Sequence, residues 1–142
     1  MEVPRRIVLC LPEGMPRTDP APEETAKRDV ELAFDWDGSA LGVAGFAEGG
    51  WEAFELASAH PDLIDRLVLV ATPPREGDTD GMAAKTLLVF GQQDPDGGYA
   101  HGKWWRDALG ARLEMVPNGG RDILERAWPR VLSHLAPRTL RK

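Results

Sequence analysis

Short, continuous apolar runs alternate along this chain with segments whose apolar residues recur at helical spacing. Continuous runs of five or six residues are typical of strands that are buried on both faces of a parallel sheet. Regular alternation of strand and helix predicts an α/β domain with right-handed crossover connections. Five strands are expected, at residues 6–11, 41–45, 66–71, 86–91 and 112–116.

Four segments between and after these runs have the pattern of helices. The clearest covers 122–135, where apolar side chains follow the i, i+3, i+4 spacing. A second, 24–36, places four apolar residues on one stripe and begins with acidic residues, which the helix dipole favours. The others are expected at 50–59 and 99–109. Residues 72–81, rich in Pro, Gly and Asp, predict a loop.

The composition fits one globular domain, at 142 residues with 42% hydrophobic and 28% charged side chains. The domain is expected over 1–137, with 138–142 as a C-terminal tail. No stretch approaches a membrane span and the first residues lack the features of a signal peptide, so a cytoplasmic protein without membrane contact is predicted.

The single cysteine, Cys10, excludes an intrachain disulfide and is expected in packing. With three scattered histidines, neither a metal nor another cofactor is expected.

The net charge of −6 is unevenly distributed along the chain. Residues 1–100 carry 8 basic and 19 acidic side chains, and residues 101–142 carry 9 basic and 4 acidic ones. The favoured interpretation is solvated helix faces whose opposite charges meet across the fold. The alternative is an anion site near the C-terminal end, suggested by Arg121, Arg126 and Arg130. No nucleic-acid partner is expected, because the chain is acidic overall and lacks a basic stripe with interleaved aromatics.

Glycines flank Ala47 at the junction between an apolar run and a predicted helix. Gly45 lies two residues before it and Gly49 two residues after it, a spacing that permits a sharp strand-to-helix turn. This segment resembles the nucleophile elbow of the α/β-hydrolase fold superfamily. Further pieces that match in order lie at 11–19, 60–72, 86–95 and 116–122. The resemblance implies a reduced α/β-hydrolase-like three-layer sandwich with about five parallel strands and no cap domain.

The same resemblance removes the usual chemistry of the family. It places Ala47 at the nucleophile position, Arg121 at the histidine position and Asp94 at the position of the acid. Alanine offers no nucleophile, and an arginine stays protonated and cannot act as a general base. The run at 6–11 best matches the family's fourth strand. On that alignment the first three strands are missing, together with the loop that supplies half of the oxyanion hole.

The candidate site residues follow from these positions. Asp94 and Arg121 are expected to form an ion pair, which either serves a reaction or only ties two loops together. Glu48, at a helix N-terminus, is a candidate base or hydrogen-bond anchor. His101 is either a proton donor at the pocket rim or a helix-surface residue. The predicted site therefore comprises Asp94, Glu48 and Arg121 as catalytic groups, Phe46, Ala47, Thr72 and Asp122 as the ligand pocket, and His101 as proton donor.

Three functions are compatible with these residues. The first is non-hydrolytic binding of a small apolar molecule in the vestigial pocket, with isomerisation, epimerisation or cyclisation as candidate reactions. The second is a pseudoenzyme that acts as a binding or assembly module. The third is an esterase-type hydrolase whose serine at position 47 was changed to alanine. With fewer strands and helices, one sheet face should also expose apolar surface, which predicts a homodimer or another partner that covers it.

Overall fold

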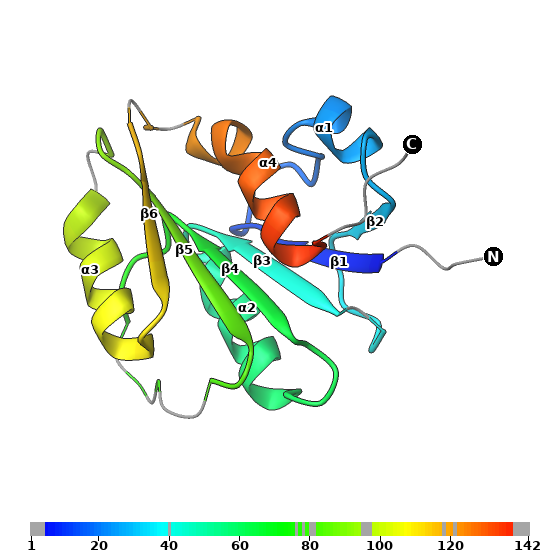
Figure 1. Cartoon of the computed structure of the whole chain (residues 1–142), viewed down its shortest axis with the longest axis horizontal. Coiled ribbons are helices and arrows are strands. Elements are labelled where there is room, and N and C mark those ends of the chain that lie inside the picture. The colour runs from blue at the N-terminus through cyan, green and yellow to red at the C-terminus, as the bar shows by residue number, and fades with distance from the viewer. Residues whose placement is uncertain are drawn as a thin grey trace.

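The computed structural model describes residues 5–39, 41–75, 77, 79, 82–94, 98–117, 119–120 and 122–137. Six parallel strands form one sheet in the order β2-β1-β3-β4-β5-β6 (Figure 1). The elements in chain order are β1 (Arg5–Cys10), α1 (Pro22–Ala26), β2 (Val30–Ala33), β3 (Gly42–Phe46), α2 (Gly49–Ala59), β4 (Arg66–Val70), β5 (Lys85–Gly91), α3 (Gly98–Leu109), β6 (Arg112–Val116) and α4 (Ile123–Leu135).

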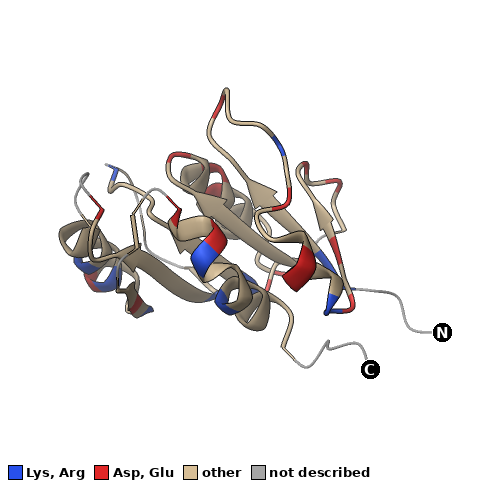
Figure 2. Ribbon diagram, turned by 90° about the horizontal axis from the view of Figure 1, so that it is seen from above, with Lys and Arg blue, Asp and Glu red and all other residues tan. Residues whose placement is uncertain are grey.

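Helices cover both faces of the sheet and make three layers. Helices α1 and α4 lie on one face, and α2 and α3 lie on the other (Figures 1 and 2). Two apolar cores result, one centred on Trp128 of α4 and one on Phe54 of α2 and Trp105 of α3. The three-layer α/β sandwich predicted from the sequence is confirmed, with six strands instead of about five.

The two-sided arrangement follows from a reversal of direction at β1. The chain moves from β1 outward to β2, then passes back to β3 on the other side of β1 and continues through β4 and β5 to β6. Right-handed crossovers place their helices on opposite faces when the direction reverses. The reversal therefore puts α1 on one face and α2 and α3 on the other. It also creates a topological switch point between β1 and β3.

The helix predicted at 24–36 is wrong over its second half. Only Pro22–Ala26 is helical, and Val30–Ala33 is an edge strand whose residues pair with Arg5 to Val8 of β1. Alternate side chains of this strand face the two cores, with Val30 and Leu32 on the α4 side and Ala33 on the other. Four apolar residues in so short a segment are compatible with the spacing of a helix and with that of a strand. The segment forms a strand because it can pair with the edge of β1.

The predicted bare apolar face is also wrong. On the α4 side of the sheet, Val68, Val70, Leu87 and Val89 are buried within the single chain. Beside the C-terminal half of α4, polar side chains of the strands, among them Arg66, Arg112 and Glu114, line a cavity on this face. The homodimer prediction therefore loses its basis in this surface and stays untested. No helix in the described part of the chain is long and apolar enough to cross a lipid bilayer.

A hydrogen-bond relay holds α1 against α4. The indole N–H of Trp128, a fully buried side chain, donates to Thr25 Oγ1 at 2.8 Å. The Thr25 hydroxyl in turn donates to Asp19 Oδ1 at 3.0 Å, and the Ala21 backbone N–H donates to the same oxygen at 3.0 Å. The relay satisfies the one polar atom of a large core residue and fixes the loop that leads from β1 into α1.

Replacement of Thr25 by valine removes the acceptor for the Trp128 indole while keeping the size of the side chain. A buried donor left without a partner costs about 1–3 kcal/mol, so Thr25→Val should lower the free energy of unfolding by about that amount. Thr25→Ser retains the hydroxyl and is the matched control. Urea unfolding of the three proteins measures the difference, and equal stabilities for the valine and serine variants would refute the relay.

Candidate functional site

The candidate site lies at the carboxyl ends of the strands, at the switch point between β1 and β3. In open α/β sheets, ligands bind in the crevice that forms at this place. Ala47 follows the last residue of β3 and has a backbone φ of 50°. This left-handed conformation is uncommon for a residue with a side chain. It is the strained strand-to-helix turn expected of a nucleophile elbow.

Three glycines let the elbow pack against its surroundings. A Cβ added to Gly45 would lie closer than 3.0 Å to the backbone of Gly50, and one added to Gly49 would lie equally close to the backbone of Cys10. A Cβ on Gly50 would meet the side chain of Thr72 at a similar separation. The start of α2 therefore approaches the ends of β1 and β4 so closely that no side chain fits between them.

Backbone hydrogen bonds continue the sheet past the elbow. The Ala47 N–H donates to Val70 O at 2.9 Å, and the Ala71 N–H donates to Val89 O at 2.9 Å. Ala71 also has a positive φ, of 53°. The adjacent strands β3 and β4 are therefore each followed by a residue in the left-handed conformation.

Strand β1 does not correspond to the family's fourth strand, as the sequence had suggested. If β3 is the elbow strand, then β2 is the strand before it and β1 is the third strand of the family. The loop after β1 thus takes the place of the loop that supplies an oxyanion-hole N–H in α/β hydrolases. The end of β1 and Leu11 lie directly against Gly49 at the elbow. The predicted absence of this loop is wrong.

The loops after β5 and β6 are joined beside the candidate acid. The Gln93 N–H donates to Gly119 O at 3.0 Å, and Gly91 packs against Gly119 so closely that a Cβ would not fit. Asp94 is half-buried, and its N–H donates to Gly91 O at 3.3 Å. Arg121 lies outside the described residues. The predicted ion pair between Asp94 and Arg121 therefore stays a prediction.

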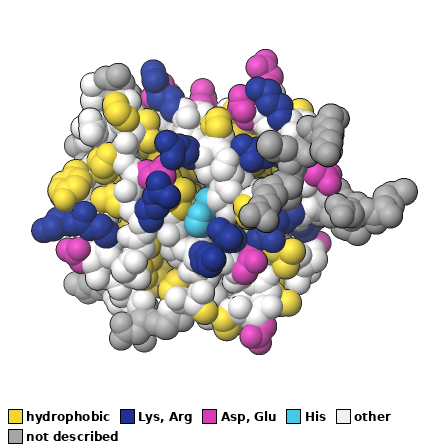
Figure 3. Space-filling model, viewed as in Figure 1, with side chains coloured by type: hydrophobic (Ala, Val, Ile, Leu, Met, Phe, Trp, Pro, Cys, Tyr) yellow, Lys and Arg dark blue, Asp and Glu magenta, His cyan; other side chains and the backbone are white. Residues whose placement is uncertain are grey.

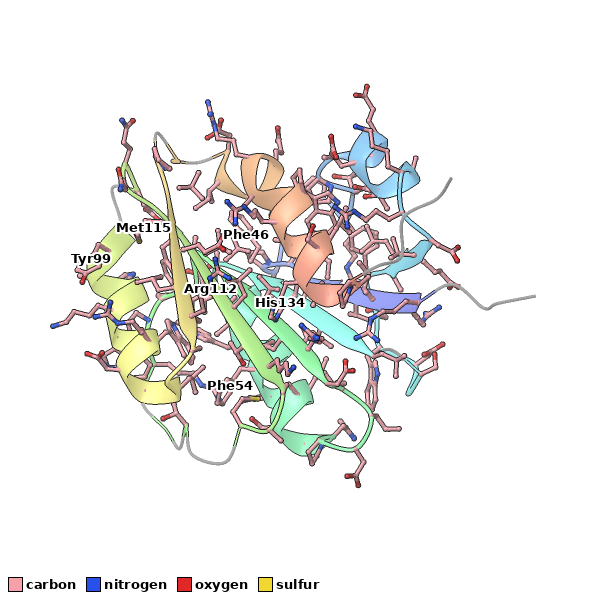
Figure 4. All side chains as sticks on the ribbon, in the orientation of Figure 1. Phe46, Phe54, Tyr99, Arg112, Met115 and His134 are labelled. Carbon is pink, nitrogen blue, oxygen red and sulfur yellow. The ribbon has the colours of Figure 1, made fainter. Side chains whose placement is uncertain are left out.

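A small cavity of about 120 Å³ adjoins the elbow on the α4 side. It is lined by Phe46, the last residue of β3, which Figure 4 labels, and by Asp122. Both were predicted as pocket residues. Arg126 Nε lies 2.5 Å from Asp122 Oδ2, and the hydrogen bond it donates lowers the pKa of that carboxyl. The remaining lining residues are Met15, Thr18, Asp19, Pro20, Leu124 and Glu125.

The other predicted residues do not line this cavity. Thr72 is fully buried behind Gly50, Glu48 is exposed at the N-terminus of α2, and His101 is half-buried in the first turns of α3. Among the described residues, no group of three or more His, Cys, Asp or Glu side chains could hold a metal ion.

Two tryptophans that the sequence did not place at the site hold the loop after β4. The indole N–H of Trp51 donates to Pro73 O at 2.9 Å, and that of Trp105 donates to Thr72 O at 2.9 Å. Trp105 is fully buried, whereas Trp104 is 38% exposed. Only Trp105 of these two neighbours therefore belongs to the core. The partners of the indoles could not be read from the sequence, because they are backbone carbonyls distant along the chain.

Cys10 ends β1 beside the elbow but is not a nucleophile. Burial, followed by the nearby charges of Glu52 and Asp35, raises the pKa of its thiol from 9.0 to about 12. The reactive thiolate is therefore scarce at neutral pH. The packing role expected for Cys10 agrees with its burial.

Comparisons with known proteins agree with this architecture. No family model matches the chain, and no curated protein matches it in sequence. Similar solved structures include a CIB-like hydrolase from Thermoplasma acidophilum, with a TM-score of 0.65 and 18% identity over 91% of this chain and 84% of that one. A hydrolase of the α/β superfamily from Xanthomonas campestris has a TM-score of 0.65 and 17% identity, over 92% of this chain and 96% of that one.

S-formylglutathione hydrolase from Staphylococcus aureus has a TM-score of 0.66 and 12% identity over 93% of this chain and 80% of that one. Identities this low establish the fold alone. The chain therefore has a reduced α/β-hydrolase-like fold, as the elbow and its neighbouring motifs predicted. The Xanthomonas protein is matched over nearly its whole length, so the reduced size also occurs in a solved structure of this superfamily.

The contact between Gly50 and Thr72 gives a direct test of the elbow. Gly50→Ala forces a methyl group into the Thr72 side chain and should destabilise the protein by about 1–3 kcal/mol, although alanine has the higher helix propensity. Gly120→Ala is the control, because a Cβ there has only Gln93 O within 4 Å, at 3.8 Å. Thermal and urea unfolding report the difference. Equal effects of the two substitutions would show that the elbow is not closely packed.

Proposed function

We propose that this protein binds a small, largely apolar molecule in the crevice beside Ala47 and does not hydrolyse esters. The observation that carries the proposal is a strained elbow that presents a methyl group. Ala47 keeps the positive φ of a nucleophile elbow, and three closely packed glycines support it, while the side chain offers no attacking atom. Phe46, Met15 and Leu124 supply apolar walls for such a molecule.

Polar groups expected from the sequence would orient the ligand. Asp94 and Glu48 are the groups we assign to proton transfer in an isomerisation, epimerisation or cyclisation, and Arg121 is the clamp for a carboxylate or oxyanion. In this proposal Asp122 shapes the pocket, with its charge held by Arg126, and His101 is a proton donor at the rim. The cavity beside Phe46 is smaller than the ~300–1,000 Å³ typical of ligand sites, which favours a ligand of few heavy atoms.

A hydrolase is the second candidate, because the structural neighbours are named hydrolases. The loop after β1 supports it, since it lies where α/β hydrolases place one donor of the oxyanion hole. A missing serine at position 47 and an arginine at the position of the base oppose it. The assembly-module alternative has weaker support, because the sheet face it required is covered by α4.

Binding of a neutral apolar probe tests the first proposal. Benzyl alcohol, titrated into the ¹⁵N-labelled protein, should shift the amide resonances of Ala47 and Leu124 in a saturable way. Loss of the aromatic contact in Phe46→Leu should weaken binding by about threefold to tenfold. Tyr99→Leu, which removes an exposed aromatic ring on α3, should have no effect. If benzyl alcohol caused no shifts, or if Phe46→Leu left its affinity unchanged, the assignment of this crevice would be overturned.

Restoring the nucleophile separates the two candidates. Ala47→Ser should leave the hydrolysis of 4-nitrophenyl acetate at the level of the unmodified protein, because a serine without a general base is a weak nucleophile. The measurement is release of 4-nitrophenolate with time. Sustained turnover by Ala47→Ser above the unmodified protein would refute the non-hydrolytic role and support the hydrolase.

A further inference from the structure

A second cavity lies at the other end of the sheet from the elbow. Its volume is about 250 Å³, and it opens where β4, β5 and β6 begin, beside the C-terminal half of α4. Arg66 and Arg112 are the first residues of β4 and β6, and Arg130, Ser133 and His134 belong to α4.

The cavity has an excess of positive charge. Arg66, Arg112 and Arg130 line it, and Glu114 is the only acidic side chain among the described residues that line it. Glu114 Oε1 forms ion pairs with two arginines and lies 3.1 Å from Arg112 Nη2 and 3.0 Å from Arg130 Nη1. Figure 3 shows basic side chains around a histidine at this place, and Figure 4 identifies the histidine as His134 beside Arg112.

The donor groups at the mouth of the cavity remain accessible. The side chains of Arg112 and Arg130 are 75% and 66% exposed, whereas that of Glu114 is 17% exposed. Each guanidinium has five N–H donors, so the bond to Glu114 leaves most of them available to a ligand. Arg66 donates a long bond to His134 O at 3.5 Å, and Arg5 Nε donates to Leu135 O at 2.5 Å. These two arginines engage the negative end of α4, which would otherwise repel an anion.

His134 completes the wall of the cavity. Its Nε2 lies 2.9 Å from Lys85 O and donates to it, which fixes the ring. Burial lowers the pKa of His134, and the charges of Arg66 and Arg112 lower it further, against the opposing effects of the Lys85 bond and Glu114. The side chain of Ser133, which also lines the cavity, accepts a hydrogen bond from Arg28 Nη2 at 2.9 Å. Arginines from three separate elements, β4, β6 and α4, therefore converge at this cavity.

We propose that this cavity binds the phosphate group of a small phosphorylated molecule through Arg112 and Arg130. Paired guanidiniums match the oxygens of a phosphate in bidentate geometry and give charge-assisted hydrogen bonds. The dimensions of the cavity suit a phosphate with a small organic body. The site is independent of the crevice beside Ala47, because it lies at the opposite ends of the strands.

Titration of the ¹⁵N-labelled full chain with inorganic phosphate, and separately with glycerol 3-phosphate, tests the site. Potassium chloride at matched ionic strength serves as the blank. Saturable shifts are expected at Leu87, Arg112 and His134 with both phosphates and not with chloride. Arg112→Gln or Arg130→Gln should each weaken binding by about tenfold, the loss expected for one charge-assisted contact.

Arg126→Gln is the matched control. It removes the same charge from α4 one turn before Arg130, but Arg126 pairs with Asp122 and does not line the cavity. It should change the affinity less than twofold. Arg112→Lys keeps a cation beside Glu114 but loses the planar guanidinium that can bind two phosphate oxygens. This variant should fold normally and bind phosphate more weakly than the unmodified protein does.

The titration of His134 provides a second readout. A bound phosphate stabilises the imidazolium against Arg66 and Arg112, so the pKa of His134 should rise when phosphate binds. Shifts equal to those in chloride, or equal losses in Arg126→Gln and Arg130→Gln, would overturn the site. Binding only to phosphatidic acid vesicles would replace the small molecule with a lipid headgroup and overturn the proposal as stated.

Discussion

The close approach of α2 to the ends of β1 and β4 is the constraint on which the rest of the structure depends. Gly45, Gly49 and Gly50 leave no space for a side chain, so the helix begins directly against the sheet. That approach forces the turn at Ala47 into a left-handed conformation. This turn places residue 47 at the carboxyl end of β3, beside the switch point between β1 and β3. A sequence without these glycines could form the strands and the helix but not this junction.

The two candidate sites divide the sheet between them. The carboxyl ends of the strands carry the elbow, the loop after β1 and a small cavity with acidic and apolar walls. The amino ends of β4 to β6 carry an excess of arginine beside α4. The uneven charge of the chain, acidic in its first hundred residues and basic afterwards, thus contributes to a local basic surface. The ion pairs between described residues, such as Arg5 with Asp65 and Arg130 with Glu114, join partners within the same part of the chain and not across the two parts. The two proposals of ligand binding therefore concern opposite ends of the sheet.

Most of the fold could be predicted from the sequence, because local patterns report burial and turn geometry. The runs that became β1, β3, β4, β5 and β6 were placed within a residue or so, and the helix at 122–135 was placed equally well. The strand at Val30–Ala33 was missed, since its apolar residues satisfy a helical stripe too. Among the site residues, Phe46 and Asp122 were brought to one cavity, whereas Thr72 is buried against Gly50 instead. Whether a predicted residue lines the cavity depends on the conformation of the loop that carries it. The spacing of residues along the chain does not determine that conformation.

The sequence by itself determined the class of fold, the glycine-supported elbow and the absence of a nucleophile at Ala47. These depend on the identity and the order of nearby residues, which physical chemistry links to backbone conformation and reactivity. Only the tertiary structure decided that β1 lies between β2 and β3, and that α4 buries the face expected to be bare. It alone gathered Arg66, Arg112 and Arg130 around one cavity. Strand order and the meeting of distant side chains depend on long-range packing, which no local pattern records.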